Sequence, residues 1–349
     1  MEPGSRKNAQ SWPYPRHKAY EETLRQSNSV WFADKGYPVN DRVTYILKAW
    51  EDWGRNIILP EVRDYIWKTQ EERTAKHEGF PLHKYLHHGL SSQAMVFNLI
   101  GPLIIRGDLL PLKKSFEDAG IQWPEGTVSA RFEAEDRQVF REDSGQPTSI
   151  DLVIQGENPN QTLFIESKLV EHEFGGCSVF QAGDCDGKNP AYDLSHCYLH
   201  HLGRKYWSVM EKQGFLDGLA GYSPICPFAL YYQYFREVMF SIESDGDFVL
   251  LHDDRNPTFY CGEPSKKRGL MPFLLTFVPE SLKSRIHSVS IQQILANYLN
   301  FEKMDWVDEF KKEIRFSWLG FLFKKIIYST IKIQPVDAKP IPFLALRSV

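Results

Sequence analysis

The chain lacks the long apolar segments that membrane insertion requires. Its most apolar late stretch, residues 316–327, is interrupted by Lys324 and Lys325 and is too short to span a bilayer. The opening residues, MEPGSRKNAQSWPYP, are polar and contain no apolar run of the kind found in secretory signals. We therefore expect no membrane association and no export.

Cysteine is scarce, and no charge of one sign dominates. The 349 residues include 5 cysteines, and an odd number of this size argues against a disulfide framework and for the reducing cytoplasm. The net charge of −4 means that any contact with nucleic acid must come from local basic patches. With 42% hydrophobic residues, the chain is typical of a globular protein with a sizeable core.

The most informative stretch is residues 149–169, SIDLVIQGENPNQTLFIESKL. Two apolar runs flank the polar segment GENPNQ, which is the pattern of a β-hairpin. A turn centred on the Asn-Pro pair of this segment places Asp151 directly opposite Glu166 on one face of the sheet. Lys168 shares that face, because side chains alternate along a strand with a period of two.

This trio of charges has two interpretations. Opposed carboxylates repel each other, and a divalent cation such as Mg²⁺ or Mn²⁺ would relieve the repulsion by binding their oxygens. The alternative is a solvent-exposed ladder of charges on a two-stranded ribbon. Apolar residues on both sides of the charges are typical of buried strands, which favours the metal site.

The order of Asp151 followed by Glu166-Ser167-Lys168 at the end of the next strand resembles the D…ExK signature of the PD-(D/E)xK nuclease superfamily. Ile150 stands where many members have proline. Four further segments strengthen the resemblance and are similar to one prokaryotic branch of the superfamily: SSQAMVFNLIGPL, FGGCS, CYLHHLGRKYW and CPFALYYQYFRE. The resemblance covers roughly residues 86–240.

The resemblance implies a metal-dependent nuclease that hydrolyses phosphodiester bonds. In it, Asp151, Glu166 and the backbone carbonyl of Ser167 would hold Mg²⁺ or Mn²⁺, and Lys168 would act on the attacking water or on the phosphate. DNA is favoured over RNA as the partner, because the superfamily acts mostly on DNA. The alternative is a non-catalytic nucleic-acid-binding or assembly module that keeps the nuclease fold. A homo-oligomer is compatible with either.

The resemblance also implies the architecture, an α/β (α+β) restriction-endonuclease-like core. We expect a mixed central sheet in αβββαβ order, formed by a helix over 91–100, strands near 130, 151 and 164, a helix over 192–213 and a strand over 227–235. The expected divisions of the chain are a disordered N-terminus (1–13), a helical leader packed on the core (14–85), the nuclease core (86–240) and a mostly helical extension (241–349).

Four residues are weaker candidates for the site. Glu135 follows Glu133 on the alternation of the first strand and could add a metal ligand, although a solvated acid at a strand edge is the more common case. Arg204 and Lys205 form the strongest local basic patch, for which phosphate contact and plain solvation are equally compatible. Gln233, on the last expected strand, completes the expected substrate-binding set.

Four cysteines fall in or beside the expected nuclease core: Cys177, Cys185, Cys197 and Cys226. Their spacing is long and irregular, without the short C-x₂-C pairs of zinc sites. The resemblance adds an iron–sulfur cluster as an alternative, because some superfamily members carry one on four cysteines. Buried cysteine is common in protein cores, so we expect core cysteines rather than zinc or a cluster.

Overall fold

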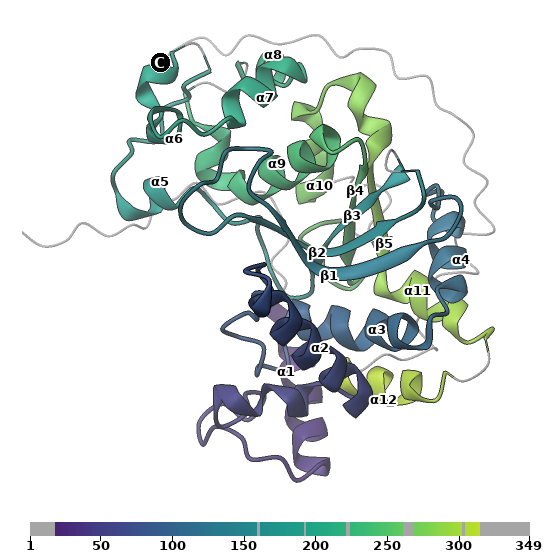
Figure 1. Ribbon diagram of the computed structural model, residues 1–349. Helices are drawn as coiled ribbons and strands as arrows, with labels where there is room; N and C mark the ends of the chain where they lie inside the picture. The colour runs from purple at the N-terminus through teal and green to yellow at the C-terminus, as the bar shows by residue number, and fades with distance from the viewer. Residues whose placement is uncertain are drawn as a thin grey trace, which may run out of the picture.

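The computed structural model describes residues 18–158, 161–191, 193–220, 224–260, 269–301 and 304–314 (Figure 1). The expected disordered N-terminus and the expected helical residues beyond 314 lie outside these ranges. None of the helices in the described ranges is long and apolar enough to cross a membrane.

A five-stranded mixed sheet forms the centre of the molecule (Figure 1). The strands follow one another across the sheet in chain order: β1 (Ser129–Asp136), β2 (Thr148–Gln155), β3 (Leu163–Lys168), β4 (Asp247–His252) and β5 (Ile286–Ser290). Neighbours are antiparallel from β1 to β3 and parallel from β3 to β5. The expected mixed sheet with restriction-endonuclease-like architecture is confirmed.

The register of the β2–β3 hairpin is the one that the sequence predicts. Leu152 pairs with Ile165, and Ile154 pairs with Leu163. Continuing this register by one pair places Asp151 directly opposite Glu166. The alternation of apolar residues fixes it, because a slip by one position would turn every buried side chain of the strand to the other face.

Both faces of the sheet are covered, which explains why its strands are apolar on both sides. Leu152, Ile154 and Ile165 belong to one hydrophobic core, and Val153 and Phe164 belong to a second core on the other face. The first core is completed by helices α2 (Pro60–Ala75), α3 (Ser92–Arg106), α4 (Leu110–Asp118), α11 (Ile291–Tyr298) and α12 (Trp306–Glu313). The second is completed by α7 (Tyr206–Lys212), α9 (Pro227–Glu243) and α10 (Leu270–Leu274).

Helix α3 confirms the expected helix over 91–100 and extends beyond it. Ser91 caps its start by accepting a hydrogen bond from the Ala94 N–H at 3.2 Å. Pro102 lies inside the helix and does not stop it, because the helix reaches Arg106. It ends at Gly107, whose φ of +66° is readily adopted only by glycine.

Two expected elements are wrong. Residues 227–235 are not a strand but the first half of α9, and the fourth strand is β4. The aromatic residues that suggested a strand, including Phe228 and Tyr234, instead pack into the second core. The expected core boundary at residue 240 therefore falls inside α9, ahead of two strands of the same sheet.

The expected helix over 192–213 is also wrong, because the segment is broken into three pieces. These are the 3-10 helix η3 (Leu194–His196), α6 (Tyr198–His201) and α7. Gly203, with a φ of +76°, separates α6 from α7. The remaining short elements are η1 (Trp50–Asn56), α5 (Ser178–Ala182), α8 (Leu216–Ala220), η4 (Leu275–Phe277) and η5 (Glu280–Arg285). The first long helix, α1 (Lys18–Asp34), packs on α12.

Candidate active site

The charged residues of the β2–β3 hairpin lie together in one cleft, which we call the acid cleft. Asp151, Glu166 and Lys168 all line it. The other walls come from residues between 81 and 93, residues between 170 and 175, and one side of α9. Glu166 and Lys168 are buried, with 3% and 6% of their surface exposed, so this is no solvated charge ladder.

Glu166, Lys168 and Gln233 form a closed triangle of hydrogen bonds. Lys168 Nζ lies 2.5 Å from Glu166 Oε1 and 3.0 Å from Gln233 Oε1. Gln233 Nε2 donates to the same Glu166 Oε1 at 2.7 Å. Helix α9, which carries Gln233, is thereby joined to β3 at the site. The amide holds both partners of the ion pair in place.

Asp151 is oriented by the residue between Glu166 and Lys168. Its Oδ2 accepts hydrogen bonds from the Ser167 N–H at 2.8 Å and from the Ser167 hydroxyl at 2.6 Å. Within the described ranges, Asp151 Oδ1 and Glu166 Oε2 carry no hydrogen bond. Each of these two oxygens is therefore left to bind a ligand in the acid cleft.

Glu237 adds a further carboxylate to the cleft, one helical turn after Gln233 on α9. It is 1% exposed, and neither of its oxygens has a hydrogen-bond partner among the described residues. A buried carboxylate without partners is costly unless it is protonated or meets a cation. Burial raises the pKa of Glu237 to about 7, although Lys168 and Arg236 act in the opposite direction.

Glu133 is a further buried acid at the cleft, and its backbone conformation is unusual. The β1–β2 register places it opposite Asp151, yet this pair is missing from the ladder, because Glu133 has a φ of +51°. Arg73 of α2 holds the strained segment by donating to the carbonyls of Phe132 at 2.9 Å and Glu133 at 2.5 Å. Strain of this kind at a non-glycine residue is often found at functional sites.

The carboxylate of Glu133 is held at the cleft, and that of Glu135 is not. Glu133 Oε1 accepts from Gln93 Nε2 at 2.6 Å, and Oε2 accepts from the Ser149 hydroxyl at 3.1 Å. Glu135 is absent from the cleft lining, and its carboxylate lies against the backbone at Gly79. If a third strand-borne acid assists the pair, the structure favours Glu133 over the Glu135 that alternation suggested.

The site holds more acid than base, and this shifts its pKa values. Burial and then the neighbouring Asp151 raise the pKa of both Glu133 and Glu166 well above the ordinary range. Burial also raises the pKa of Asp151, against the opposing effect of Lys168. Burial alone would lower the pKa of Lys168, but the surrounding carboxylates raise it above its ordinary value. The ammonium is therefore charged, and the acids compete for protons.

The residues present fit a hard divalent cation. The candidate ligands are oxygens of Asp151, Glu166 and Ser167, and the nearby Glu237 carboxylate, which lacks a hydrogen-bond partner among the described residues, adds negative charge that a cation would balance. No three His, Cys, Asp or Glu side chains of the described chain already converge on one point. Mg²⁺ does not need three, since it is usually bound through one or two carboxylates and keeps several waters.

Comparison with known proteins agrees with this geometry. The model of the family described as Restriction Endonuclease associating with ARP matches residues 18–313. The chain belongs to this family. The match includes all five strands and Glu133, Asp151, Glu166 and Glu237, so this restriction-endonuclease-like family accounts for the fold and indicates nuclease activity. Comparison with curated proteins and comparison with solved structures found no match.

The restriction-endonuclease-like fold does not bring the expected basic patch to the acid cleft. Arg204 donates to the carbonyls of Arg141 and Ser144 in the connection between β1 and β2, at 2.6 Å for Ser144. Neither Arg204 nor Lys205 is among the residues that line the cleft. Gln233, by contrast, lies at its centre.

Sequence reasoning missed Glu237 and Glu133, and only Glu237 had a signal in the sequence. Gln233 and Glu237 are four residues apart, which places them on one face once the segment is recognised as a helix. The stretch that forms α9 is 17 residues long, which is longer than an ordinary strand, and this length was the clue to a helix. Glu133 falls opposite Asp151 only when the β1–β2 pairing is known, and residues 137–147 form no tight turn that would reveal it.

Proposed function

We propose that this protein is a metal-dependent nuclease that hydrolyses phosphodiester bonds in DNA. The observation that carries the proposal is the opposed pair Asp151 and Glu166, with Lys168 beside it, in a cleft of a restriction-endonuclease-like protein. Two opposed carboxylates with one ammonium leave an excess of negative charge in a largely buried site, which is unfavourable and indicates a function that uses it.

In this proposal, Asp151 Oδ1, Glu166 Oε2 and the carbonyl of Ser167 are the protein ligands of Mg²⁺ or Mn²⁺. The bound ion would lower the pKa of a water and bind the scissile phosphate. Lys168 cannot be a ligand, because an ammonium has no lone pair. Its role is to stabilise the negative charge that develops on the phosphate, and Gln233 keeps its Nζ in position.

The rim of the cleft offers a contact surface for the nucleic acid. Tyr85 is 45% exposed, and Lys84 Nζ lies 4.8 Å from the centroid of its ring. The ring of His88 lies 4.9 Å from that of Tyr85, and burial lowers the pKa of His88 to about 4, so this histidine is neutral. We assign Lys84 to a phosphate and Tyr85 to stacking on a base.

Two further assignments belong to the proposal. DNA rather than RNA is the substrate, following the superfamily that the D…ExK pattern resembles. The family description also names ARP, and we propose that this chain associates with it. The rival function is a non-catalytic nucleic-acid-binding or assembly module, which would have no use for a charged Lys168 beside the acid pair.

Incubation with DNA tests the proposal. Linear, circular and single-stranded DNA are each mixed with the purified protein, with Mg²⁺, with Mn²⁺ or with EDTA. The proposal expects cleavage with either metal, none with EDTA and none by Glu166→Gln. Binding without cleavage in every metal condition would support the rival function.

A further inference from the structure

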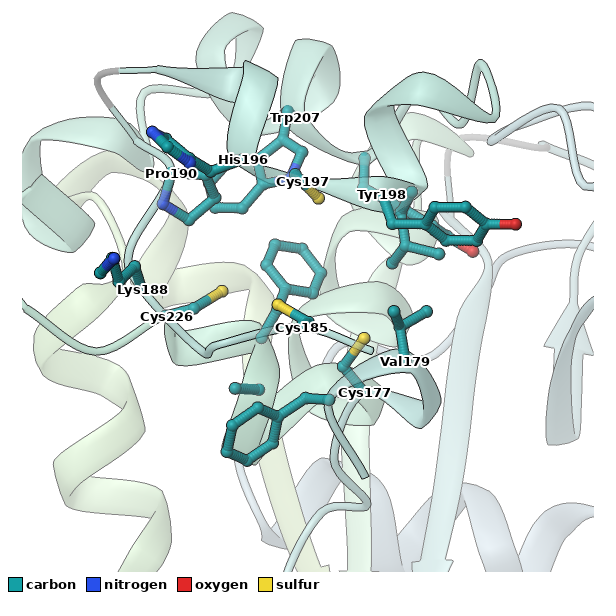
Figure 2. A pocket seen from close by; sticks show the side chains of 15 residues that line it. Cys177, Val179, Cys185, Lys188, Pro190, His196, Cys197, Tyr198, Trp207 and Cys226 are labelled. Atoms are coloured by element: carbon teal, nitrogen blue, oxygen red, sulfur yellow. Dashed lines mark hydrogen bonds between the residues drawn. The ribbon is translucent and has the colours of Figure 1, made fainter. Parts of the chain in front are cut away.

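Four cysteines that take no part in the acid cleft lie around a second pocket (Figure 2). Cys177 precedes α5, Cys185 follows it, Cys197 precedes α6 and Cys226 precedes α9. All four are free thiols. Figure 2 shows them on different sides of the pocket, with the sulfurs of Cys177, Cys185 and Cys226 turned toward its interior.

Backbone contacts hold these cysteines in place. The Cys177 N–H donates to the carbonyl of Phe228 at 3.2 Å, and the Cys226 N–H donates to the carbonyl of Gly187 at 2.7 Å. The hydrogen bond from Cys177 to Phe228 thus holds Cys177 close to the segment that begins at Cys226, although 48 residues lie between the two cysteines in the chain. The rest of the pocket is mostly apolar and aromatic, including Trp207.

Two of the sulfurs already accept N–H hydrogen bonds. Trp207 Nε1 donates to Cys197 Sγ at 3.1 Å, and the Gly187 N–H donates to Cys185 Sγ at 3.4 Å. Donors directed at sulfur stabilise negative charge on it, and such hydrogen bonds tune sulfur ligands in metal centres. If the four cysteines only filled space in the core, they would not have to share one pocket, and their sulfurs would not have to accept hydrogen bonds.

We propose that Cys177, Cys185, Cys197 and Cys226 are the ligands of an iron–sulfur cluster. Thiolates select soft metal centres, and a zinc site needs its four sulfurs about 2.3 Å from a single point. Among the described residues no three such side chains converge in this way. A cluster accepts sulfurs spread around a pocket, because its cysteines bind different iron atoms. This revises the expectation of core cysteines, which rested on their spacing and on how common buried cysteine is in protein cores.

The cluster would serve as a staple for the segment that leads from β3 to α9. The regular elements of that segment are short: α5, η3, α6, α7 and α8 each span at most 7 residues. Metal binding can supply the free energy that such a segment lacks. Because Cys226 directly precedes α9, the staple would also position the helix that carries Gln233 and Glu237.

Anaerobic purification of the full chain tests the proposal through its content of iron, acid-labile sulfide and zinc. We expect iron and sulfide in equal amounts, about two or about four of each per chain. Zinc without sulfide, or no metal at all, would overturn the proposal. This result is independent of nuclease activity, so it separates the cluster from the proposed function.

Serine variants then test the ligand assignment. Cys226→Ser and Cys185→Ser should each lose most of the iron, whereas Cys261→Ser, at the fifth cysteine, should retain it. Limited proteolysis provides a second measurement if a variant folds poorly: removal of iron from the wild-type protein with a chelator should expose residues 177–226 to cleavage first. Retention of iron by Cys226→Ser, or its loss from Cys261→Ser, would contradict the assignment.

Discussion

Gln233 Nε2 donates a 2.7 Å hydrogen bond to Glu166 Oε1, which joins helix α9 to strand β3 across the acid cleft. The same Gln233 accepts from Lys168 Nζ at 3.0 Å. One amide thus holds an acid and a base that belong to the same strand. The site is a three-membered unit rather than a pair, and its two charged members should behave differently when each is replaced.

Lys168→Ala should reduce cleavage without weakening metal binding. An ammonium cannot bind a cation, and its removal takes away a repelling charge, so Mn²⁺ affinity should stay equal or rise slightly. Cleavage should fall by roughly 10²–10³, as is typical when one preorganised charge-stabilising group is lost. Calorimetric titration with Mn²⁺ and a cleavage assay measure the two effects.

Lys68→Ala, at an exposed lysine of α2, is the control and should change neither Mn²⁺ affinity nor cleavage. Asp151→Asn removes a charged metal ligand and should weaken Mn²⁺ binding. If Lys168→Ala weakened Mn²⁺ binding as severely as Asp151→Asn, the role of Lys168 would be structural.

Replacing Glu133 and Glu135 of β1 one at a time should separate their roles. Glu133→Gln should weaken Mn²⁺ binding, because it removes a negative charge that faces Asp151. Glu135→Gln should leave the affinity at the wild-type value, since Glu135 does not line the cleft. The same titration measures both variants. The reverse order of effects would restore Glu135 as the third acid.

Glu237 should make stability fall with rising pH. Its pKa is raised to about 7 from an ordinary value of 4.5, so the folded protein keeps a proton that the unfolded chain has released. The free energy of unfolding therefore decreases as the pH rises from about 4.5 to 7, by about 3 kcal/mol in total. Glu237→Gln should flatten this slope in urea unfolding measured across the range. Glu280→Gln, at an exposed glutamate, is the control. An unchanged slope in Glu237→Gln would show that Glu237 is ionised throughout.

Lys84 and Tyr85, at the rim of the acid cleft, should make the contacts with DNA that Arg204 and Lys205 were expected to make. Lys84→Ala should weaken binding and reduce its salt dependence by about 0.9 in slope, the value for one phosphate contact. Tyr85→Ala should weaken binding with little change in slope, because stacking is not ionic. Arg204→Ala with Lys205→Ala should leave the slope unchanged, since neither lines the cleft. Fluorescence anisotropy with labelled DNA at several salt concentrations measures all three.

The sequence alone was sufficient where local pattern decides structure. The hairpin register follows from alternating apolar residues and one polar turn, so the opposition of Asp151 and Glu166 could be predicted. The sequence alone was insufficient where tertiary packing decides. Residues 227–235 are rich in Tyr and Phe, which favour strands, yet their aromatic side chains fill the second core from a helix. Glu237 depends on that helix, and the cysteine pocket depends on contacts between segments far apart in the chain.

The most direct test of the proposed activity is a cleavage assay of the wild-type protein beside Glu166→Gln on linear DNA with Mg²⁺. Replacing Glu166 by its uncharged isostere removes a metal ligand and keeps an oxygen for Gln233 and Lys168, so the fold should be preserved, as circular dichroism would verify. The wild-type protein should cut the DNA, and Glu166→Gln should leave it intact. Cleavage by Glu166→Gln at the wild-type rate, or none by the wild-type protein with Mg²⁺ or Mn²⁺ on any DNA form, would contradict the assignment of this site.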